Sequence, residues 1–148
     1  MLMKVAQFER LFRQAASLDV DKNDLRRLSD FIRDKIRDLL EVAAKNAKFN
    51  GRDYLVSLDL PLTKGLQNSI EEFKKLDVAL ELVPVLDELK ALPPIDIVIS
   101  EDVENMLPEI AGGLVVAYAR VIKELDPKVK NPETAHHERA RRVFDLLI

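Results

Sequence analysis

The chain contains no cysteine among its 148 residues. A disulfide framework, a thiolate metal site and a cysteine nucleophile are therefore excluded, and nothing points to an oxidising compartment, so we expect a cytoplasmic protein. Long hydrophobic runs are also missing, because the longest apolar stretch, near residues 112–119, is far shorter than the roughly 20 residues of a membrane span. The sequence thus predicts no membrane partner.

Glycine is scarce, with four residues, and runs that alternate apolar and polar side chains are nearly absent. Apolar residues recur instead every three or four positions, which is the spacing of a buried helix face. The sequence therefore predicts an all-α fold. The segment IDIVIS, residues 95–100, follows two prolines, and we interpret it as a loop between helices.

Charged residues make up 33% of the chain and apolar residues 47%, a composition typical of a folded domain with a heavily charged surface. The net charge of −3 is unevenly spread, because residues 1–75 carry 15 basic and 12 acidic side chains and residues 76–148 carry 8 and 14. Residues 77–109 hold nine carboxylates and one lysine, whereas residues 128–142 are basic. Blocks of one sign are usually solvated faces.

The apolar pattern predicts six helices in the order short, long, short in each half of the chain. They are expected near residues 4–16, 22–48, 60–73, 78–89, 101–125 and 140–147. Asp21 or Asp19 is expected to cap the second helix, Asp59 the third and Ser100 the fifth. A shift of 79 residues superposes one half on the other in pattern. We therefore expect two halves, 1–75 and 76–148, that form one compact domain.

The segment GRDYLVSLD after the first long helix places Arg52 seven residues before Asp59, with Leu55 between them. The short, long, short order and this spacing resemble the histone fold, in which an arginine of this loop precedes by seven residues the aspartate that opens the third helix. Tyr54 departs from the threonine common in histones, and the shifted second half has Asn131 and Glu138 instead of the pair.

Over nearly the whole chain the pattern resembles bacterial single-chain proteins with two tandem histone folds, a family of unassigned role. The resemblance implies an intramolecular pseudo-dimer in which the two long helices cross. It also implies a structural ion pair between Arg52 and Asp59. An ordinary surface ion pair is the alternative for these two residues.

Gly112 and Gly113 lie inside the second long helix, where each glycine is unfavourable by about 1 kcal/mol relative to alanine. One interpretation is a close crossing of the two long helices, which the missing side chains would permit. The other is a kink assisted by Pro108. The sequence leaves both open.

Residues with metal-ligand chemistry cluster only at Glu133, His136, His137 and Glu138. Carboxylate-bridged metal sites in helical bundles need a second Glu-x-x-His motif, and adjacent histidines diverge by about 100° on a helix. We therefore favour a solvated helix start over a metal site. No glycine-rich phosphate loop or catalytic triad is recognisable. The sequence predicts a non-enzymatic protein without a cofactor, as a monomer or a small homo-oligomer.

Two functions remain after this exclusion. The first is a protein-interaction or architectural module. The alternative is a histone analogue that binds DNA weakly and without sequence specificity, since a sequence pI near 5.5 is far from the basic character typical of DNA-binding domains. By position, the resemblance implies phosphate contacts at Arg10, Arg13, Lys48, Arg52, Lys128 and Lys130.

Overall fold

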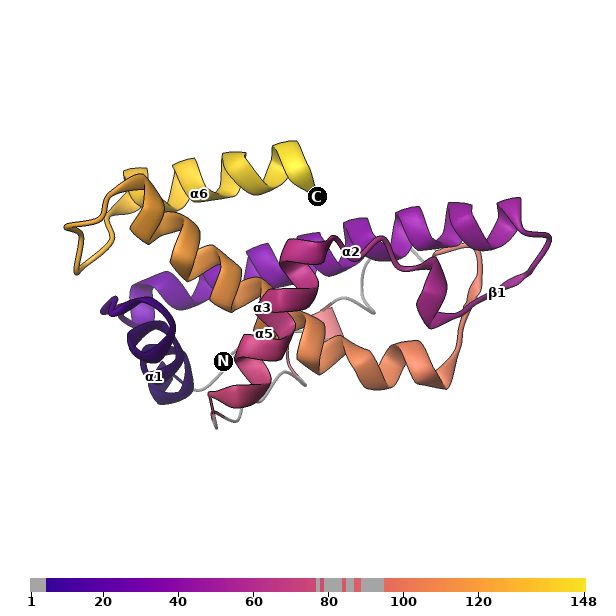
Figure 1. Ribbon diagram of the computed structural model, residues 1–148, viewed down its shortest axis with the longest axis horizontal. Coiled ribbons are helices and arrows are strands. Elements are labelled where there is room, and N and C mark those ends of the chain that lie inside the picture. The colour runs from indigo at the N-terminus through magenta and orange to yellow at the C-terminus, as the bar shows by residue number, and fades with distance from the viewer. Residues whose placement is uncertain (1–4, 77, 79–83, 85–86, 89–94) are drawn as a thin grey trace.

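A computed structural model describes residues 5–76, 78, 84, 87–88 and 95–148 (Figure 1). Helices dominate the described part, as the sequence predicts. They are α1 (Val5–Ala16), α2 (Leu25–Phe49), α3 (Lys64–Lys75), α5 (Glu101–Leu125) and α6 (Thr134–Leu147), with short 3₁₀ turns at Lys22–Asp24 and Ser57–Asp59. The helix predicted over residues 78–89 lies largely outside the described residues, as do Asp77 and Glu81 of the acidic block.

The two long helices, α2 and α5, run in opposite directions through the middle of the molecule (Figure 1). Each buries the apolar stripe that its sequence predicts. On α2 the buried stripe is Leu25, Leu28, Ile32, Ile36, Leu39 and Ala43, and on α5 it is Leu107, Ile110, Leu114, Val115, Tyr118 and Ile122. All of these side chains belong to one hydrophobic cluster to which both halves of the chain contribute.

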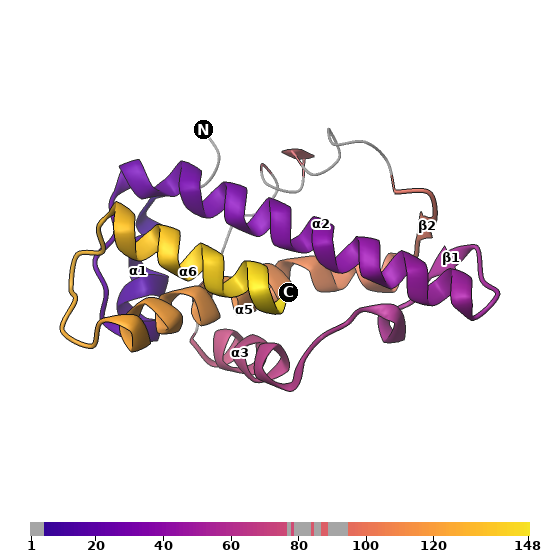
Figure 2. The ribbon, with the colours of Figure 1, turned by 90° about the horizontal axis from the view of Figure 1, so that it is seen from above.

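The shorter helices cover this pair. α3 and α1 pack on α5, whereas α6 lies along α2 and runs in the same direction (Figure 2). Ion pairs join α2 to α6 along their length. Asp34 pairs with Arg141 at 2.9 Å, and Lys35 pairs with Asp145 at 2.6 Å. Among the helices that the structure describes, none combines the length and the apolar character that a membrane crossing needs.

Local capping starts two of the helices where the sequence predicts. The Asp21 side chain accepts a hydrogen bond from the backbone N–H of Asn23 at 2.8 Å and opens the 3₁₀ turn that leads into α2. Ser100 caps α5 by accepting from the N–H of Val103 at 3.4 Å.

The predicted cap of α3 at Asp59 is wrong. Thr63 caps that helix, since its hydroxyl oxygen accepts from the N–H of Leu66 at 3.1 Å. Leu60 is extended, with φ −66° and ψ 126°, because the following Pro61 disfavours a helical conformation of the residue before it. Asp59 therefore lies at the end of the 3₁₀ turn Ser57–Asp59, before α3 begins, and its side chain is available for a different partner.

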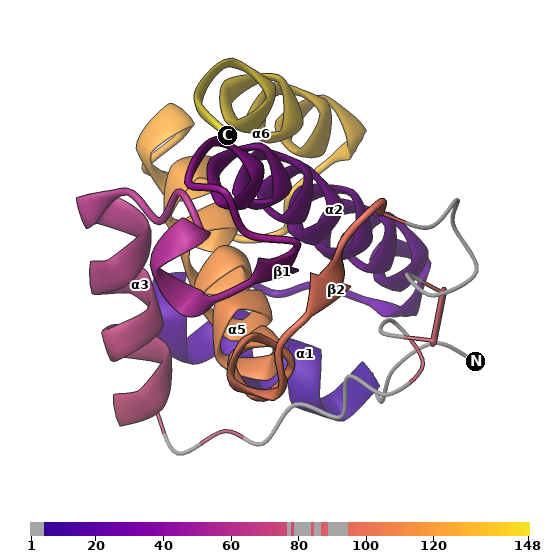
Figure 3. The same cartoon turned by 90° about the vertical axis from the view of Figure 1, so that its right-hand side faces the viewer.

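The all-α prediction misses a small parallel sheet. β1 (Tyr54–Leu55) pairs with β2 (Val98–Ile99), with Tyr54 opposite Val98 and Leu55 opposite Ile99 (Figure 3). The segment 95–100 is therefore partly a strand rather than only a loop. Each strand has two residues, too few for a periodic signal, and its hydrogen-bond partner comes from a distant part of the sequence.

A second contact between loops lies at the opposite end of the long helices. The backbone N–H of Asp19, between α1 and α2, donates to the carbonyl oxygen of Lys130, between α5 and α6, at 2.8 Å. The loop that precedes one long helix thus meets the loop that follows the other long helix at both ends of the pair. This arrangement has an approximate two-fold character.

Candidate functional site

The predicted pair of Arg52 and Asp59 is present as a two-pronged ion pair. The Nη1 and Nη2 atoms of Arg52 donate to Oδ2 and Oδ1 of Asp59 at 2.6 and 2.7 Å. Asp59 is 3% exposed, and its Oδ2 also accepts from the N–H of Val56 at 2.8 Å. Nη1 of Arg52 donates further to the carbonyl oxygen of Tyr54 at 3.3 Å. The pair therefore ties β1 to the 3₁₀ turn that follows it.

These contacts shift both ionisation equilibria in the direction that favours the charged forms. The hydrogen bond from Arg52 lowers the pKa of Asp59 against the opposing effect of burial, and the same hydrogen bond raises the pKa of Arg52. The carbonyl oxygen of Asp59 accepts from Nδ2 of Asn46 on α2 at 2.8 Å. The ion pair and the Asn46 hydrogen bond together connect α2, β1 and the 3₁₀ turn. We therefore assign Arg52 and Asp59 a structural role rather than a reactive one, and we call this ion pair the lock.

The basic residues predicted to contact phosphate are divided between the two ends of the molecule. At one end, Asp19 lies 3.5 Å from Nε of Arg13 and 3.9 Å from Nζ of Lys130. At the other end, Nζ of Lys48 is 3.3 Å from Oδ2 of Asp96. Arg10 and Lys128 are exposed. The structure therefore does not bring all of these cations to one place, and it puts a carboxylate beside four of them, since Arg52 pairs with Asp59.

Gly112 and Gly113 face α3. A Cβ atom at Gly112 would come within 2.4–2.5 Å of the Phe73 ring, and one at Gly113 would meet Cγ1 of Ile70 at 2.4 Å and its backbone at 2.9 Å. The nearest neighbours thus belong to α3, so the close approach at these glycines is between α5 and α3 and not between the two long helices, which was one of the two interpretations that the sequence left open. The absence of a side chain is still needed, because the backbones of α5 and α3 approach each other too closely here for a Cβ atom.

The histidines do not form the solvated helix start that the sequence suggests. His137 is 1% exposed, and its Nδ1 lies 2.8 Å from the hydroxyl of Tyr118 on α5. His136 instead contacts Oδ2 of Asp126 through Nε2 at 3.0 Å. Among the described residues, no three His, Asp or Glu side chains are grouped to hold a metal ion. A shared site for Glu133, His136 and His137 is therefore not formed in this part.

An open hollow of about 290 Å³ lies where α2, α5 and α6 meet. Its lining consists of Arg27, Phe31, Tyr118, His137, Glu138, Arg141 and Arg142. The planes of the Phe31 and Tyr118 rings are inclined at 51° to each other, with centroids 4.6 Å apart. Sequence reasoning missed this hollow, because its residues come from three helices and only their joint packing creates it.

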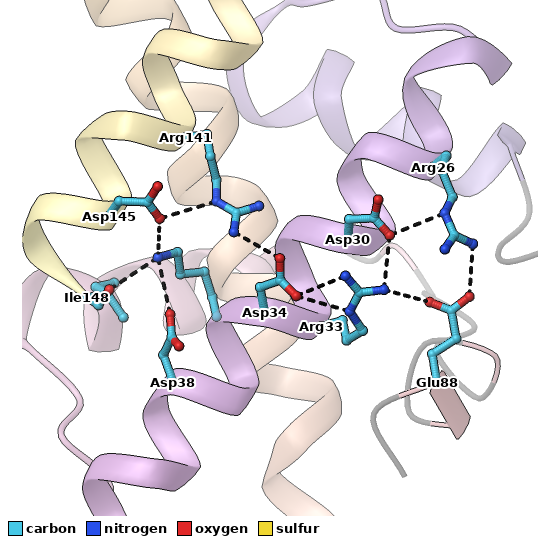
Figure 4. A network of polar contacts seen from close by, with 10 residues as sticks. Arg26, Asp30, Arg33, Asp34, Asp38, Glu88, Arg141, Asp145 and Ile148 are labelled. Carbon is cyan, nitrogen blue, oxygen red and sulfur yellow. Dashed lines mark hydrogen bonds and ion pairs between the residues drawn. The ribbon is translucent and has the colours of Figure 1, made fainter. Parts of the chain in front are cut away.

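A network of ion pairs continues from this region across α2 (Figure 4). Nζ of the buried Lys35 lies 2.6 Å from Asp145, 3.3 Å from Asp38 and 3.2 Å from the carbonyl oxygen of Ile148. Further along, the network includes Arg26, Asp30, Arg33, Asp34, Glu88 and Arg141. Two of its oxygens, Oδ1 of Asp30 and Oε2 of Glu88, lie at ion-pair distance from arginines without hydrogen-bond geometry. The network fastens α6 to α2.

Large apolar side chains are exposed at the end of the molecule that carries the sheet. Phe49, the last residue of α2, is 90% exposed, and Leu58 is 93% exposed. Tyr54 and Val98, opposite each other on β1 and β2, are exposed as well. We call Phe49, Tyr54, Leu58 and Val98 the apolar end.

These observations define a mostly helical protein whose two halves share one core and whose loops pair at both ends. The chain belongs to the family described as a domain of unknown function, DUF1931, which matches residues 8–145. It is 31% identical over 139 residues to an uncharacterised protein of Aquifex aeolicus (strain VF5), with 85% of this chain and 81% of that protein covered. A second uncharacterised protein of the same organism is 27% identical over 118 residues, with 80% and 69% covered.

Two crystal structures are similar over nearly the full chain. A protein from Thermus thermophilus has 68% sequence identity and a TM-score of 0.94, with all of both chains covered. A protein from Aquifex aeolicus has a TM-score of 0.80 at 23% identity, with 97% of this chain and 94% of that chain covered. The latter likeness shows a shared fold.

Proposed function

We propose that residues 1–75 and 76–148 are two histone-fold-like halves paired within one chain. Two features support this proposal: the antiparallel long helices share one core, and each loop before a long helix pairs with the loop after the other. The Arg52 and Asp59 lock sits where the resemblance to histone folds places it. In such a pair, neither half buries its long helix without the other.

The function that follows is that of a non-enzymatic architectural module which docks a second copy of the same chain. The observation that carries this proposal is the apolar end, with Phe49 and Leu58 at 90% and 93% exposure. Exposed apolar side chains gathered in one region are typical of interaction surfaces. The cations beside them, Lys48 and Arg52, are each paired with a carboxylate of the same chain, so two copies could approach with little like-charge repulsion.

DNA binding is the weaker candidate. Arg13, Lys48 and Lys130 each lie within 4 Å of an aspartate, which a phosphate would have to displace or approach against its charge. Because the cations also lie at two separate ends, they do not form one continuous basic track. Weak and non-specific binding remains the expected outcome.

Sedimentation velocity between roughly 10 and 200 µM tests the proposed function, since weak interfaces have dissociation constants in this range. We expect association that increases with concentration in the wild type and a monomer for the double variant Phe49→Ser/Leu58→Ser. Leu147→Ser is the matched control, because Leu147 is 72% exposed on α6 and outside the apolar end. A wild type that stays monomeric throughout, or a double variant that associates equally well, would refute the proposal.

A further inference from the structure

A second open hollow, of about 320 Å³, lies between α3 and α5, and we call it the groove. Its apolar lining consists of Leu62, Ile70, Met106 and Ile110. Ile70 and Ile110 are buried in the core, whereas Leu62 and Met106 are only partly buried and pack against the core from outside. Leu62 and Met106 therefore give the groove apolar surface that solvent reaches.

The polar lining of the groove carries no net charge. It consists of two lysines, two glutamates and two amides, namely Lys64, Lys74, Glu71, Glu109, Gln67 and Asn68. Nζ of Lys74 lies 3.3 Å from Glu71 and 3.2 Å from Glu109, and the cation of Lys64 balances the negative charge that remains. A neutral rim around apolar side chains favours an uncharged apolar group over a polyanion or a highly charged peptide.

Leu58 is an exposed side chain of matching chemistry. It is 93% exposed in the middle of the 3₁₀ turn Ser57–Asp59. Ser57 is uncharged, and the carboxylate of Asp59 is buried in the lock, so the tip of the turn carries no free charge. The lock and the buried Leu60 also hold the turn in place, which limits the conformational freedom that Leu58 would lose on binding.

The turn and the groove lie on the same side of the molecule. The turn lies between the sheet and α3, on the side of α5 that α3 covers (Figure 2, Figure 3). Leu58 precedes Leu62 of the groove by four residues, but its exposure shows that it does not fill the groove of its own chain. Because both features belong to one surface, a single two-fold rotation would place Leu58 of each copy at the groove of the other.

We propose that Leu58 of one copy inserts into the groove of a second copy, where it contacts Leu62 and Met106. This inference rests on the self-association proposed above and assigns it a receiving surface. The flexible thioether of Met106 adapts readily to an inserted side chain. Removal of these partly exposed apolar groups from water drives the contact. The apolar end thus supplies the inserted side chain, and the groove extends the interface onto α3 and α5.

Disulfide trapping tests this contact, since the full chain has no cysteine of its own. Leu58→Cys and Met106→Cys are prepared as separate variants, one of them ¹⁵N-labelled, and mixed at about 100 µM under mild oxidation. Because each chain then holds one cysteine, a disulfide between the two variants forms only across two copies, and it needs Cα atoms within about 7 Å of each other. We expect this mixed dimer, identified by its mass, as the main cross-linked product.

Asn105→Cys is the matched control for the trapping experiment. Asn105 is exposed on α5 beside Met106 and does not line the groove. Mixed with Leu58→Cys, it should cross-link at least about fivefold less than Met106→Cys. Equal yields, or cross-links only between two Leu58→Cys chains, would overturn the groove contact and leave self-association standing.

Sedimentation velocity of charge variants provides the second test. Met106→Glu places a carboxylate among the apolar side chains of the groove and should raise the dissociation constant of the dimer at least about tenfold. Asn105→Glu adds the same charge outside the groove and should change it much less, and circular dichroism compares the fold of both variants. An unchanged dissociation constant in Met106→Glu would contradict the inference. A wild type that stays monomeric would overturn self-association and the inference together, whereas a wild type that associates without the 58–106 disulfide would overturn the inference alone.

Discussion

Arg52 and Asp59 are joined by two parallel hydrogen bonds of 2.6 and 2.7 Å across the loop that carries β1. Because Asp59 is 3% exposed and accepts a further backbone hydrogen bond, its replacement leaves buried donors without a partner. We expect Asp59→Ala to lower the free energy of unfolding by about 1 to 3 kcal/mol. A double-mutant cycle with Arg52→Ala, measured by urea unfolding, should give a clear coupling energy. A coupling energy of zero would show that the pair has no structural role.

The same pair predicts a pH dependence in acid. The folded-state pKa of Asp59 is lowered by the hydrogen bond from Arg52, so its ionised form stabilises the folded state. This stabilisation is fully present above the unfolded pKa of about 3.9 and is lost as the pH falls through the folded pKa. The difference in stability between the wild type and Asp59→Asn should therefore be constant above about pH 5 and shrink below pH 4. A difference that is unchanged down to pH 2 would exclude ionisation of Asp59 as its source.

Close packing of α3 on α5 explains the two interior glycines and yields a further prediction. Gly113→Ala places a methyl group 2.9 Å from the backbone of Ile70, which cannot move independently of α3. We expect a net loss of about 1 to 3 kcal/mol in unfolding free energy, more than the gain of about 1 kcal/mol in helix propensity. Gly65→Ala is the control, because a Cβ atom there meets nothing within 4 Å. Equal stability of the Gly113 variant and the wild type would mean that α3 and α5 are less tightly packed.

The helices and two caps could be predicted because their signals are local. The stripe from Leu25 to Ala43 repeats at helical spacing, and Asp21 and Ser100 stand directly before the segments that they cap. The resemblance likewise pointed to the Arg52 and Asp59 pair, since both residues lie on the same loop. Signals of this kind need no knowledge of which elements meet in space.

The features that sequence reasoning missed all depend on distant partners. Val98 is in a strand only because Tyr54 lies beside it, and two residues show no alternation. His137 is buried because Tyr118 of α5 covers it, whereas its polar neighbours in sequence indicated a solvated helix start. The neighbours of Gly113 belong to α3, which periodicity cannot place. Assigning these contacts requires the packing of helices from different parts of the chain.

The interdependence of the two halves can also be tested. A fragment of residues 1–75 would keep α2 but lose α5, which contributes a large share of the common core. We expect the fragment to be unfolded or to dimerise through the exposed stripe of α2, as seen by circular dichroism and sedimentation. A fragment that is both monomeric and natively helical would refute the pairing of two interdependent halves.

Burial of His137 predicts a pH dependence near neutrality. Burial lowers its pKa, opposed by the charge of Asp24 and Asp21 and reinforced by Arg27 and His136. Because the unfolded state then binds the proton more readily, stability is greatest above the unfolded pKa of about 6.5 and declines as the pH falls toward the folded pKa. We expect a slope of at most about 1.4 kcal/mol per pH unit, measured by urea unfolding, that is reduced in His137→Gln. An unchanged slope in that variant would assign the titration to another group.

The last prediction concerns DNA. Lysine and arginine release counterions when they neutralise phosphates, and this effect supplies most non-specific affinity. Arg13, Lys48 and Lys130 lie beside aspartates, so we expect contacts with at most about four to six phosphates. At about 0.9 counterions per contact, affinity should fall roughly 10²- to 10³-fold between 50 and 200 mM salt.

Fluorescence anisotropy with a labelled duplex at both salt concentrations measures this dependence. Lys128→Glu/Lys130→Glu should weaken any binding at low salt, whereas Lys64→Glu/Lys75→Glu changes the net charge equally on the exposed surface of α3 and should have a smaller effect. Specific readout of bases is not expected, because it requires a helix or ribbon in the major groove and all of the predicted contacts except Arg10 lie on helix ends and loops. Submicromolar binding that survives 200 mM salt would contradict this prediction, and the same loss in both double variants would indicate a general charge effect instead of contacts by the loop between α5 and α6.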